Sequence, residues 1–247
     1  MQRISMIQCG LFLLLICPLP GRTAEEPTGF LNKTVATNGE ARAYVLYVPK
    51  DYTSSKKWPV ILFLHGSGER GDDGLKQSEV GIGAAIRMGS ERFPALVVMP
   101  QCKPDKHWAD DMADYALNAL DQTIKHYSVD TNRLYLTGLS MGGYGSWTIA
   151  TQHPDMFAAV VPICGGGDPE QAAQKLKDEP IWVFHGGADP TVPVEQAHRM
   201  VEALKAAGSS IKYTEYPGVG HNSWDKAYGE KDLTDWLFAQ TREKQKG

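Results

Sequence analysis

Hydrophobic residues in the middle of the chain occur in short unbroken runs and do not alternate with polar residues. The six runs cover residues 60–64, 95–99, 134–137, 158–163, 181–184 and 211–216. Continuous hydrophobicity is typical of strands in a sheet that helices cover on both faces. We therefore expect six buried strands of a parallel sheet.

Two further β-rich runs, at 30–37 and 41–48, are joined through Asn38-Gly39. This dipeptide tolerates the positive φ angles of a tight hairpin, so the two runs predict an antiparallel pair. Between the later strands, apolar residues recur every three or four positions, most clearly over 110–127 and again over 194–204 and 233–237. The pattern predicts an α/β architecture: an eight-stranded, mostly parallel sheet with helices on both faces.

Composition indicates a globular domain and excludes one class of partner. Of the 247 residues, 42% are hydrophobic, which is enough for a buried core. The 25 basic and 29 acidic residues are scattered and give a net charge of -4. Nucleic-acid binding requires clustered Lys and Arg, so we expect no nucleic-acid partner.

The first 24 residues have the pattern of a signal peptide. Arg3 precedes an apolar run at 9–17, and Pro18 and Pro20 end it. The run is too short to span a bilayer, so we predict cleavage near Ala24, no membrane span and a secreted or periplasmic protein. The domain organisation is then a signal peptide at 1–24 and one catalytic domain at 25–247. A lipid anchor on Cys17 is disfavoured, since Ile16 stands where a lipoprotein needs a small residue.

The mature chain would keep two cysteines, Cys102 and Cys164. An oxidising compartment permits a disulfide between them. Both follow strands of the same sheet that we do not expect to be neighbours, so we favour two separate thiols.

The segment Gly138-Leu139-Ser140-Met141-Gly142 lies between a predicted strand and a helical stretch. A serine at the apex of a sharp strand-to-helix turn exposes its hydroxyl at the edge of the sheet. Glycine two residues to either side permits the close backbone approach of such a turn. We predict that Ser140 is a nucleophile, the alternative being an ordinary turn residue.

A serine nucleophile needs a base, and the base needs an orienting carboxylate. His221 follows the eighth strand and Asp189 follows the seventh, which gives the order Ser, Asp, His that this kind of turn requires. No other histidine follows the eighth strand. Asp189 has a competing interpretation, because Asp before Pro often forms turns and Glu195 lies nearby.

Other residues on the loops at this edge are candidates for binding substrate. We expect the backbone N–H groups of Ser67 and Met141 to form an oxyanion hole, because glycines around Ser67 leave the backbone accessible. Arg70, Trp108 and Trp224 are candidate substrate contacts, with the packing of loops as the alternative for the two tryptophans and a solvated charged loop as the alternative for Arg70.

These motifs make the sequence resemble a known group, the secreted α/β-hydrolase esterases. The group includes feruloyl and acetylxylan esterases, polyhydroxybutyrate-depolymerase-like enzymes and dienelactone-hydrolase-like proteins, and similar proteins are often labelled predicted peptidases. The likeness spans about residues 40–240 and rests on the segments 64–73, 100–102, 138–143, 185–193 and 220–224. It implies an α/β-hydrolase fold and carboxylesterase activity. Dienelactone hydrolases use a Cys nucleophile, so Ser140 indicates the esterase relatives.

The length of one connection bears on the substrate. Only about seventeen residues separate Ile163 from Ile181, where lidded relatives insert a cap domain. We expect no cap and an open site for small-molecule or polysaccharide-linked esters, with feruloyl, acetyl or other short or aromatic acyl groups.

We expect no cofactor and no metal. His65 and His185 end strands, but the chain lacks H-E-x-x-H or a comparable ligand spacing, so both are expected to hold loop backbones. His107, His126, His153 and His198 are expected to be solvated.

Three other functions share some of these features. A serine peptidase of the prolyl-oligopeptidase-like type would have the same triad, and a thioesterase would use the same chemistry. A non-catalytic carbohydrate-binding protein would have no reason to hold Ser, Asp and His in order.

Overall fold

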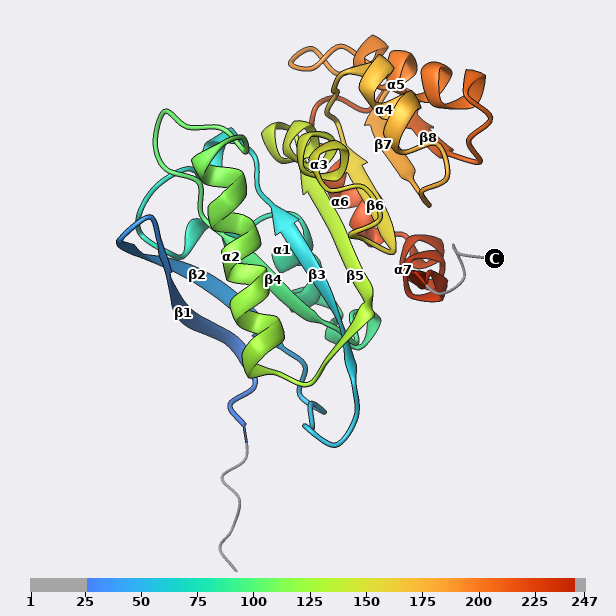
Figure 1. Ribbon diagram of the computed structural model, residues 1–247. Helices are drawn as coiled ribbons and strands as arrows, with labels where there is room; N and C mark the ends of the chain where they lie inside the picture. The colour runs from blue at the N-terminus through green and yellow to red at the C-terminus, as the bar shows by residue number, and fades with distance from the viewer. Residues whose placement is uncertain (1–25, 243–247) are drawn as a thin grey trace, which may run out of the picture.

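Eight strands form one sheet in the order β1-β2-β4-β3-β5-β6-β7-β8 (Figure 1). The computed structural model describes residues 26–242, so the predicted signal peptide lies outside the described residues. β2 pairs antiparallel with both β1 and β4, and the other pairs are parallel. The strands are β1 (Gly29–Thr37), β2 (Glu40–Val48), β3 (Trp58–Leu64), β4 (Leu96–Pro100), β5 (Val129–Leu139), β6 (Ala159–Ile163), β7 (Trp182–Gly186) and β8 (Lys212–Tyr216). The mostly parallel sheet confirms the predicted architecture.

β5 is longer than its apolar run indicates. It begins at Val129, which pairs with Trp58, and the pairing with β3 shifts register before Leu134. The intervening residues 130–133 are polar and only partly buried or exposed, so they extend the strand without adding to the apolar run. The hydrophobic pattern therefore marked only the buried half of β5.

Within residues 26–242, seven α-helices connect and cover the strands. They are α1 (Ile82–Met88), α2 (Asp111–His126), α3 (Met141–Gln152), α4 (Pro169–Lys175), α5 (Glu195–Ala206), α6 (Trp224–Gly229) and α7 (Lys231–Ala239), with short 3-10 turns η1 (Ser67–Glu69), η2 (Lys76–Ser78) and η3 (Ser90–Arg92). The helices predicted over 110–127, 194–204 and 233–237 are confirmed as α2, α5 and α7. α1 and α6 have seven and six residues, too few to show a helical period in the sequence.

The side chains of the central strands point alternately to two separate cores. On β3, Val60, Leu62 and Leu64 pack with residues of α2, α3 and α5. Ile61 and Phe63 pack on the opposite face with residues of α1, α6 and α7. Each fully buried aliphatic side chain contributes about 1.5–3 kcal/mol to folding. The sheet is thus held from both sides (Figure 1).

The connection from β6 to β7 contains one short helix. Asp168 caps α4 by accepting hydrogen bonds from the backbone N–H groups of Glu170 and Gln171, and Pro169 occupies the first turn, where it needs no hydrogen bond. α4 ends after seven residues, so the described chain has no cap domain at this position.

A helix that crosses a bilayer must be both long and predominantly apolar. No helix between residues 26 and 242 is both long enough and apolar enough.

Candidate active site

Ser140 lies at the sharp turn between β5 and α3. Its backbone has φ 52° and ψ -117°, a conformation that side-chain-bearing residues rarely adopt. A Cβ on Gly138 would approach Gly142 O to 2.3 Å, and one on Gly142 would approach Leu64 O to 1.9 Å. Both positions therefore require glycine, as the turn predicted.

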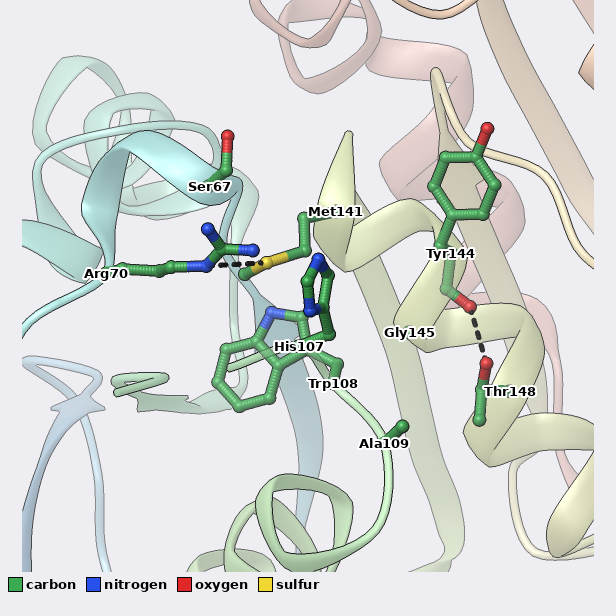
Figure 2. A pocket seen from close by; sticks show the side chains of 9 residues that line it. All are labelled: Ser67, Arg70, His107, Trp108, Ala109, Met141, Tyr144, Gly145 and Thr148. Carbon is green, nitrogen blue, oxygen red and sulfur yellow. Dashed lines mark hydrogen bonds between the residues drawn. The ribbon is translucent and has the colours of Figure 1, made fainter. Parts of the chain in front are cut away.

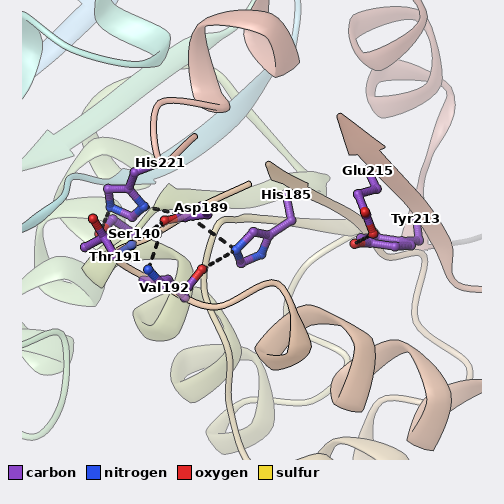
Figure 3. Close-up of polar contacts among 8 residues, drawn as sticks. All are labelled: Ser140, His185, Asp189, Thr191, Val192, Tyr213, Glu215 and His221. Atoms are coloured by element: carbon purple, nitrogen blue, oxygen red, sulfur yellow. Dashed lines mark hydrogen bonds and ion pairs between the residues drawn. The ribbon is translucent and has the colours of Figure 1, made fainter. Parts of the chain in front are cut away.

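Asp189 lies on the loop after β7, and its side chain is fully buried. Oδ1 accepts hydrogen bonds from the backbone N–H groups of Thr191 at 2.8 Å and Val192 at 3.0 Å (Figure 3). Burial alone would raise the pKa of Asp189. The hydrogen bonds from His221, Val192 and Thr191 outweigh burial, and the pKa is lowered from its ordinary value. The carboxylate is therefore ionised at neutral pH and able to stabilise a cationic neighbour.

His221 lies on the loop after β8 and connects the other two residues. Its Nδ1 is 2.7 Å from Asp189 Oδ2, and its Nε2 is 2.9 Å from Ser140 Oγ. Because the ionised carboxylate can only accept, Nδ1 carries a hydrogen and Nε2 is left to accept from the serine hydroxyl. The structure thus brings together all three residues predicted as a triad, in hydrogen-bonded series.

The two predicted oxyanion donors lie on either side of the nucleophile. Met141 is the first residue of α3, and Ser67 begins η1 just after β3. β3 and β5 are parallel neighbours, with Leu64 opposite Gly138, so the chain after each strand leaves at the same edge. A Cβ on Gly66 would lie 3.6 Å from Ser140 Cβ. Ser67 and Met141 therefore lie at the same edge of the sheet as Ser140.

A cavity of about 290 Å³ opens beside these residues (Figure 2). Its lining consists of Ser67, Arg70, His107, Trp108, Ala109, Met141, Tyr144, Gly145 and Thr148. The cavity is lined by the loop after β3, the loop before α2 and one face of α3. It is large enough for a small acyl group or one aromatic ring.

Two of the three predicted substrate contacts line this cavity. The Arg70 side chain crosses towards Met141, with Nε 3.2 Å from Sδ. Trp108 is only 2% exposed, and its Nε1 donates to the carbonyl of His65 at 2.9 Å. Trp108 therefore forms the fixed base of the cavity.

Trp224, the third, is not among the lining residues. It is the first residue of α6 and not part of a loop, because the turn after His221 continues directly into a helix. The backbone carbonyl of Ser223 accepts a hydrogen bond from the N–H of Ala227 at 3.0 Å. Its ring packs edge-on to His221, with 5.4 Å between the ring centroids. The structure thus places Trp224 as a support of His221.

Three lining residues with polar side chains were not predicted from the sequence. Tyr144 and Thr148 follow Ser140 by four and eight positions, the spacing of one helix face, which would have identified them once α3 was predicted. His107 was expected to be solvated; it is exposed and also lines the cavity.

The two strand-end histidines hold backbone groups, as expected. His65 accepts from the N–H of Cys102 through Nε2 at 2.9 Å and meets the carbonyl of Gly66 through Nδ1. Burial lowers the pKa of His65 to about 4, so its ring is neutral. His185 meets the carbonyl of Val192 through Nε2 at 2.9 Å.

Both cysteines in the described chain are free and buried, which confirms the expectation of separate thiols. They follow β4 and β6, between which β3 and β5 lie in the sheet. Burial raises the pKa of Cys102 to about 11 and of Cys164 to about 12. Neither thiol is therefore activated as a nucleophile.

One cluster in the described residues has metal-ligating atom types close together. Cys164, Asp189 and His221 each offer an atom within 4.8 Å of the others. Asp189 and His221 are hydrogen-bonded to each other, and the Cys164 thiol is protonated at neutral pH. The donor set therefore fits a hydrogen-bonded triad better than a metal.

Comparison with known proteins agrees with the geometry. The model of the dienelactone hydrolase family matches residues 98–231. A putative carboxymethylenebutenolidase of Methylorubrum extorquens is 36% identical over 127 residues, which are 44% of this chain and 43% of that protein. A bifunctional acetylxylan esterase/xylanase of Neocallimastix patriciarum is 28% identical over 177 residues, which are 67% of this chain and 24% of that protein.

A solved structure extends the likeness over most of the chain. A thermostable esterase is 36% identical with a TM-score of 0.79, and the alignment covers 86% of this chain and 63% of that one. This chain thus spans less than two thirds of each of these three proteins. The sheet order, the turn at Ser140 and the solved neighbour show the α/β-hydrolase fold. By the family match over residues 98–231, the chain belongs to the dienelactone hydrolase family.

Proposed function

We propose that the protein is a serine carboxylic-ester hydrolase that works through an acyl-enzyme. Ser140 is the nucleophile, His221 the general base and acid, and Asp189 the orienting carboxylate. The observation that carries this proposal is the unbroken hydrogen-bonded series from Ser140 Oγ through His221 to the buried Asp189. The family and the 36% identical esterase support the same reaction class.

The mechanism moves one proton back and forth. Ser140 Oγ attacks the ester carbonyl carbon while His221 Nε2 takes the hydroxyl proton. Asp189 stabilises the imidazolium that forms. The carbon–oxygen bond to the alcohol then breaks, and His221 gives its proton to the leaving alkoxide. Water repeats the route on the acyl-enzyme, which releases the acid and regenerates Ser140.

The negative charge of the tetrahedral intermediate needs donors at a fixed position. We assign the backbone N–H groups of Met141 and Ser67, since both residues line the cavity and Gly66, next to Ser67, lies close to Ser140. The removal of one such donor typically costs about 3 kcal/mol of transition-state stabilisation.

The cavity supports a short or aromatic acyl group, including acetyl and feruloyl. Trp108 and Tyr144 contribute aromatic surface, and Arg70 contributes a donor to an oxygen of the substrate. The connection that contains the short α4 forms no cap, which fits an alcohol that is a small molecule or part of a polysaccharide. The acetylxylan esterase relative supports the polysaccharide class.

The test is a panel of substrates with purified protein. It consists of p-nitrophenyl esters of increasing chain length, feruloyl and acetyl-xylan esters, and a peptide amide. We expect turnover of short and aromatic esters and none of the amide. Faster turnover of the amide would support the peptidase, and no turnover together with sugar binding would support the carbohydrate-binding protein.

We also propose that residues 1–24 direct export and are removed, which leaves one catalytic domain from residue 25. N-terminal sequencing of the exported protein tests this, and a retained residue 1 would contradict it.

A further inference from the structure

A second imidazole lies behind Asp189, on the side away from the nucleophile (Figure 3). His185, in β7, is fully buried. Its Nε2 is 2.9 Å from the carbonyl oxygen of Val192 and 3.4 Å from Asp189 Oδ2. Because a carbonyl oxygen only accepts, Nε2 carries a hydrogen. That hydrogen is donated to the Val192 carbonyl, and Asp189 Oδ2 lies beside the same nitrogen.

The ring of His185 is neutral, and only one of its two nitrogens has a hydrogen-bond partner among the described residues. Burial lowers its pKa, although the Val192 carbonyl and the Asp189 charge act in the other direction. Nδ1 is buried and has no hydrogen-bond partner among the described residues. A buried polar atom without a partner costs free energy, which an apolar ring at this position would avoid. The presence of an imidazole here is therefore explained by what its Nε2–H does.

That N–H lies next to a carboxylate that already has three hydrogen-bond donors. Oδ1 accepts from two backbone N–H groups, while Oδ2 faces His221 Nδ1 at 2.7 Å and His185 Nε2 at 3.4 Å. Val192 takes part twice, since its N–H donates to Asp189 and its carbonyl accepts from His185. The contact with His185 thus fixes both the carboxylate and the loop that carries it.

We propose that His185 is a positioning residue for Asp189, holding Oδ2 towards His221 and sharing its negative charge. This inference rests on the proposed hydrolase function. His185 acts through Asp189 and does not touch the substrate. The other ionisable groups that face it are His221, His198 and Glu215. Glu215 is itself bonded to His198 and Tyr213, each at 2.7 Å, so it does not compete for His185.

The test compares His185→Leu with His185→Gln, whose amide nitrogen reaches the position of Nε2 and can donate to the same two oxygens. For His185→Leu we expect kcat for p-nitrophenyl acetate to fall on the order of 100-fold with little change in KM, because misorientation affects the reacting groups and not binding. The acidic limb of the pH profile of kcat/KM should also shift, since both the position and the charge of Asp189 act on the proton that His221 holds. His185→Gln should restore the native kcat and the native limb.

The matched control is His198→Gln, a partly exposed histidine that bonds Glu215 and not Asp189; it should leave both readouts unchanged. A folded His185→Leu variant with native kcat and a native acidic limb would overturn the inference, as would a His185→Gln variant no better than His185→Leu. If the leucine variant does not fold, His185→Asn, whose shorter amide cannot reach Asp189, replaces it with the same expectations.

A second readout separates this inference from the proposed function. If the native protein neither hydrolyses esters nor reacts with a fluorophosphonate, the proposed function fails. The downfield proton resonance of the His221 Nδ1–H bonded to Asp189 still reports on His185. We expect this resonance to move in His185→Leu and not in His198→Gln, and an unchanged resonance would overturn the positioning role.

Discussion

At the scale of the single residue, Ser140 is placed by its backbone. Its positive φ costs roughly 1–3 kcal/mol, which the surrounding contacts must offset. Its N–H donates to the carbonyl of Ile163 at 2.9 Å, and its carbonyl accepts from the N–H of Tyr144 at 3.1 Å. β6 and the first turn of α3 therefore hold the backbone of the serine from both sides. The hydroxyl is left to hydrogen-bond with His221.

The same close packing makes Gly142→Ala a severe substitution. The added methyl group would lie 1.9 Å from Leu64 O, a backbone atom that cannot turn away. We expect a loss of about 3 kcal/mol in the free energy of unfolding, measured by urea denaturation. Gly229→Ala is the control, because a methyl group there meets no atom within 4 Å. Equal unfolding midpoints for the two variants would contradict this account of the turn.

At the scale of the element, the connection from α4 to β7 carries a buried carboxyl group. Glu179 Oε1 accepts from the N–H of Asp155 at 3.1 Å, which joins this connection to the one before β6. Burial, with the charges of Asp155 and Asp178, raises the pKa of Glu179 from 4.5 to about 7. Between these values the folded protein holds a proton that the unfolded chain releases. Stability therefore falls as pH rises through this window.

Glu179→Gln should remove this loss of stability at higher pH and keep a side-chain oxygen that accepts from the Asp155 N–H. We expect the variant to exceed the native protein by about 1–3 kcal/mol in the free energy of unfolding at pH 8, and to differ little at pH 4.5. Chemical denaturation at the two pH values measures the difference. Glu202→Gln, at an exposed position of α5, should show no such pH dependence. A gain from Glu179→Gln that is the same at both pH values would argue against a buried, protonated carboxyl group.

One face of α3 links the nucleophile to the cavity. Tyr144 and Thr148 follow Ser140 at helical spacing, and the Thr148 side chain donates to the carbonyl of Tyr144 at 3.1 Å. On the proposed function, specificity for the acyl group therefore depends on a helix whose start is fixed by the turn at Ser140.

Thr148→Phe should fill part of the 290 Å³ cavity. We expect kcat/KM to fall at least about tenfold for feruloyl esters and to change little for acetyl esters, because only the larger group needs the filled space. Gln152→Phe adds the same ring at an exposed position of α3 outside the cavity and serves as control. An equal loss for both substrates would show that the cavity does not hold the acyl group.

At the scale of the whole molecule, the sequence predicted the sheet well and the small elements poorly. β3 to β7 were predictable because burial on both faces leaves unbroken apolar runs. β1 and β2 were predictable from the hairpin turn between them, and the edge strand β8 is only partly buried or exposed. α1 and α6 were missed because one or two turns show no period, and their stability comes from packing against distant strands. The start of β5 was missed because its first residues are polar.

The site, like the fold, was predictable only in part. The positions of Ser140, Asp189 and His221 were predictable because each follows the carboxyl end of a parallel strand, and such ends meet at one edge. The contact of His185 with Asp189 was not predictable, since it depends on how the loop after β7 folds back against the strand. Trp224 was assigned to a loop because nothing in its local sequence indicates a helix as short as α6.

The account depends most on a reactive Ser140 activated by His221. The direct test is labelling of the native protein with a fluorophosphonate, followed by mass mapping of the modified peptide and comparison with Ser140→Ala and His221→Ala. We predict a single adduct on Ser140, no adduct in Ser140→Ala, and labelling slowed by several orders of magnitude in His221→Ala. An adduct on another residue, or native labelling rates in His221→Ala, would contradict it.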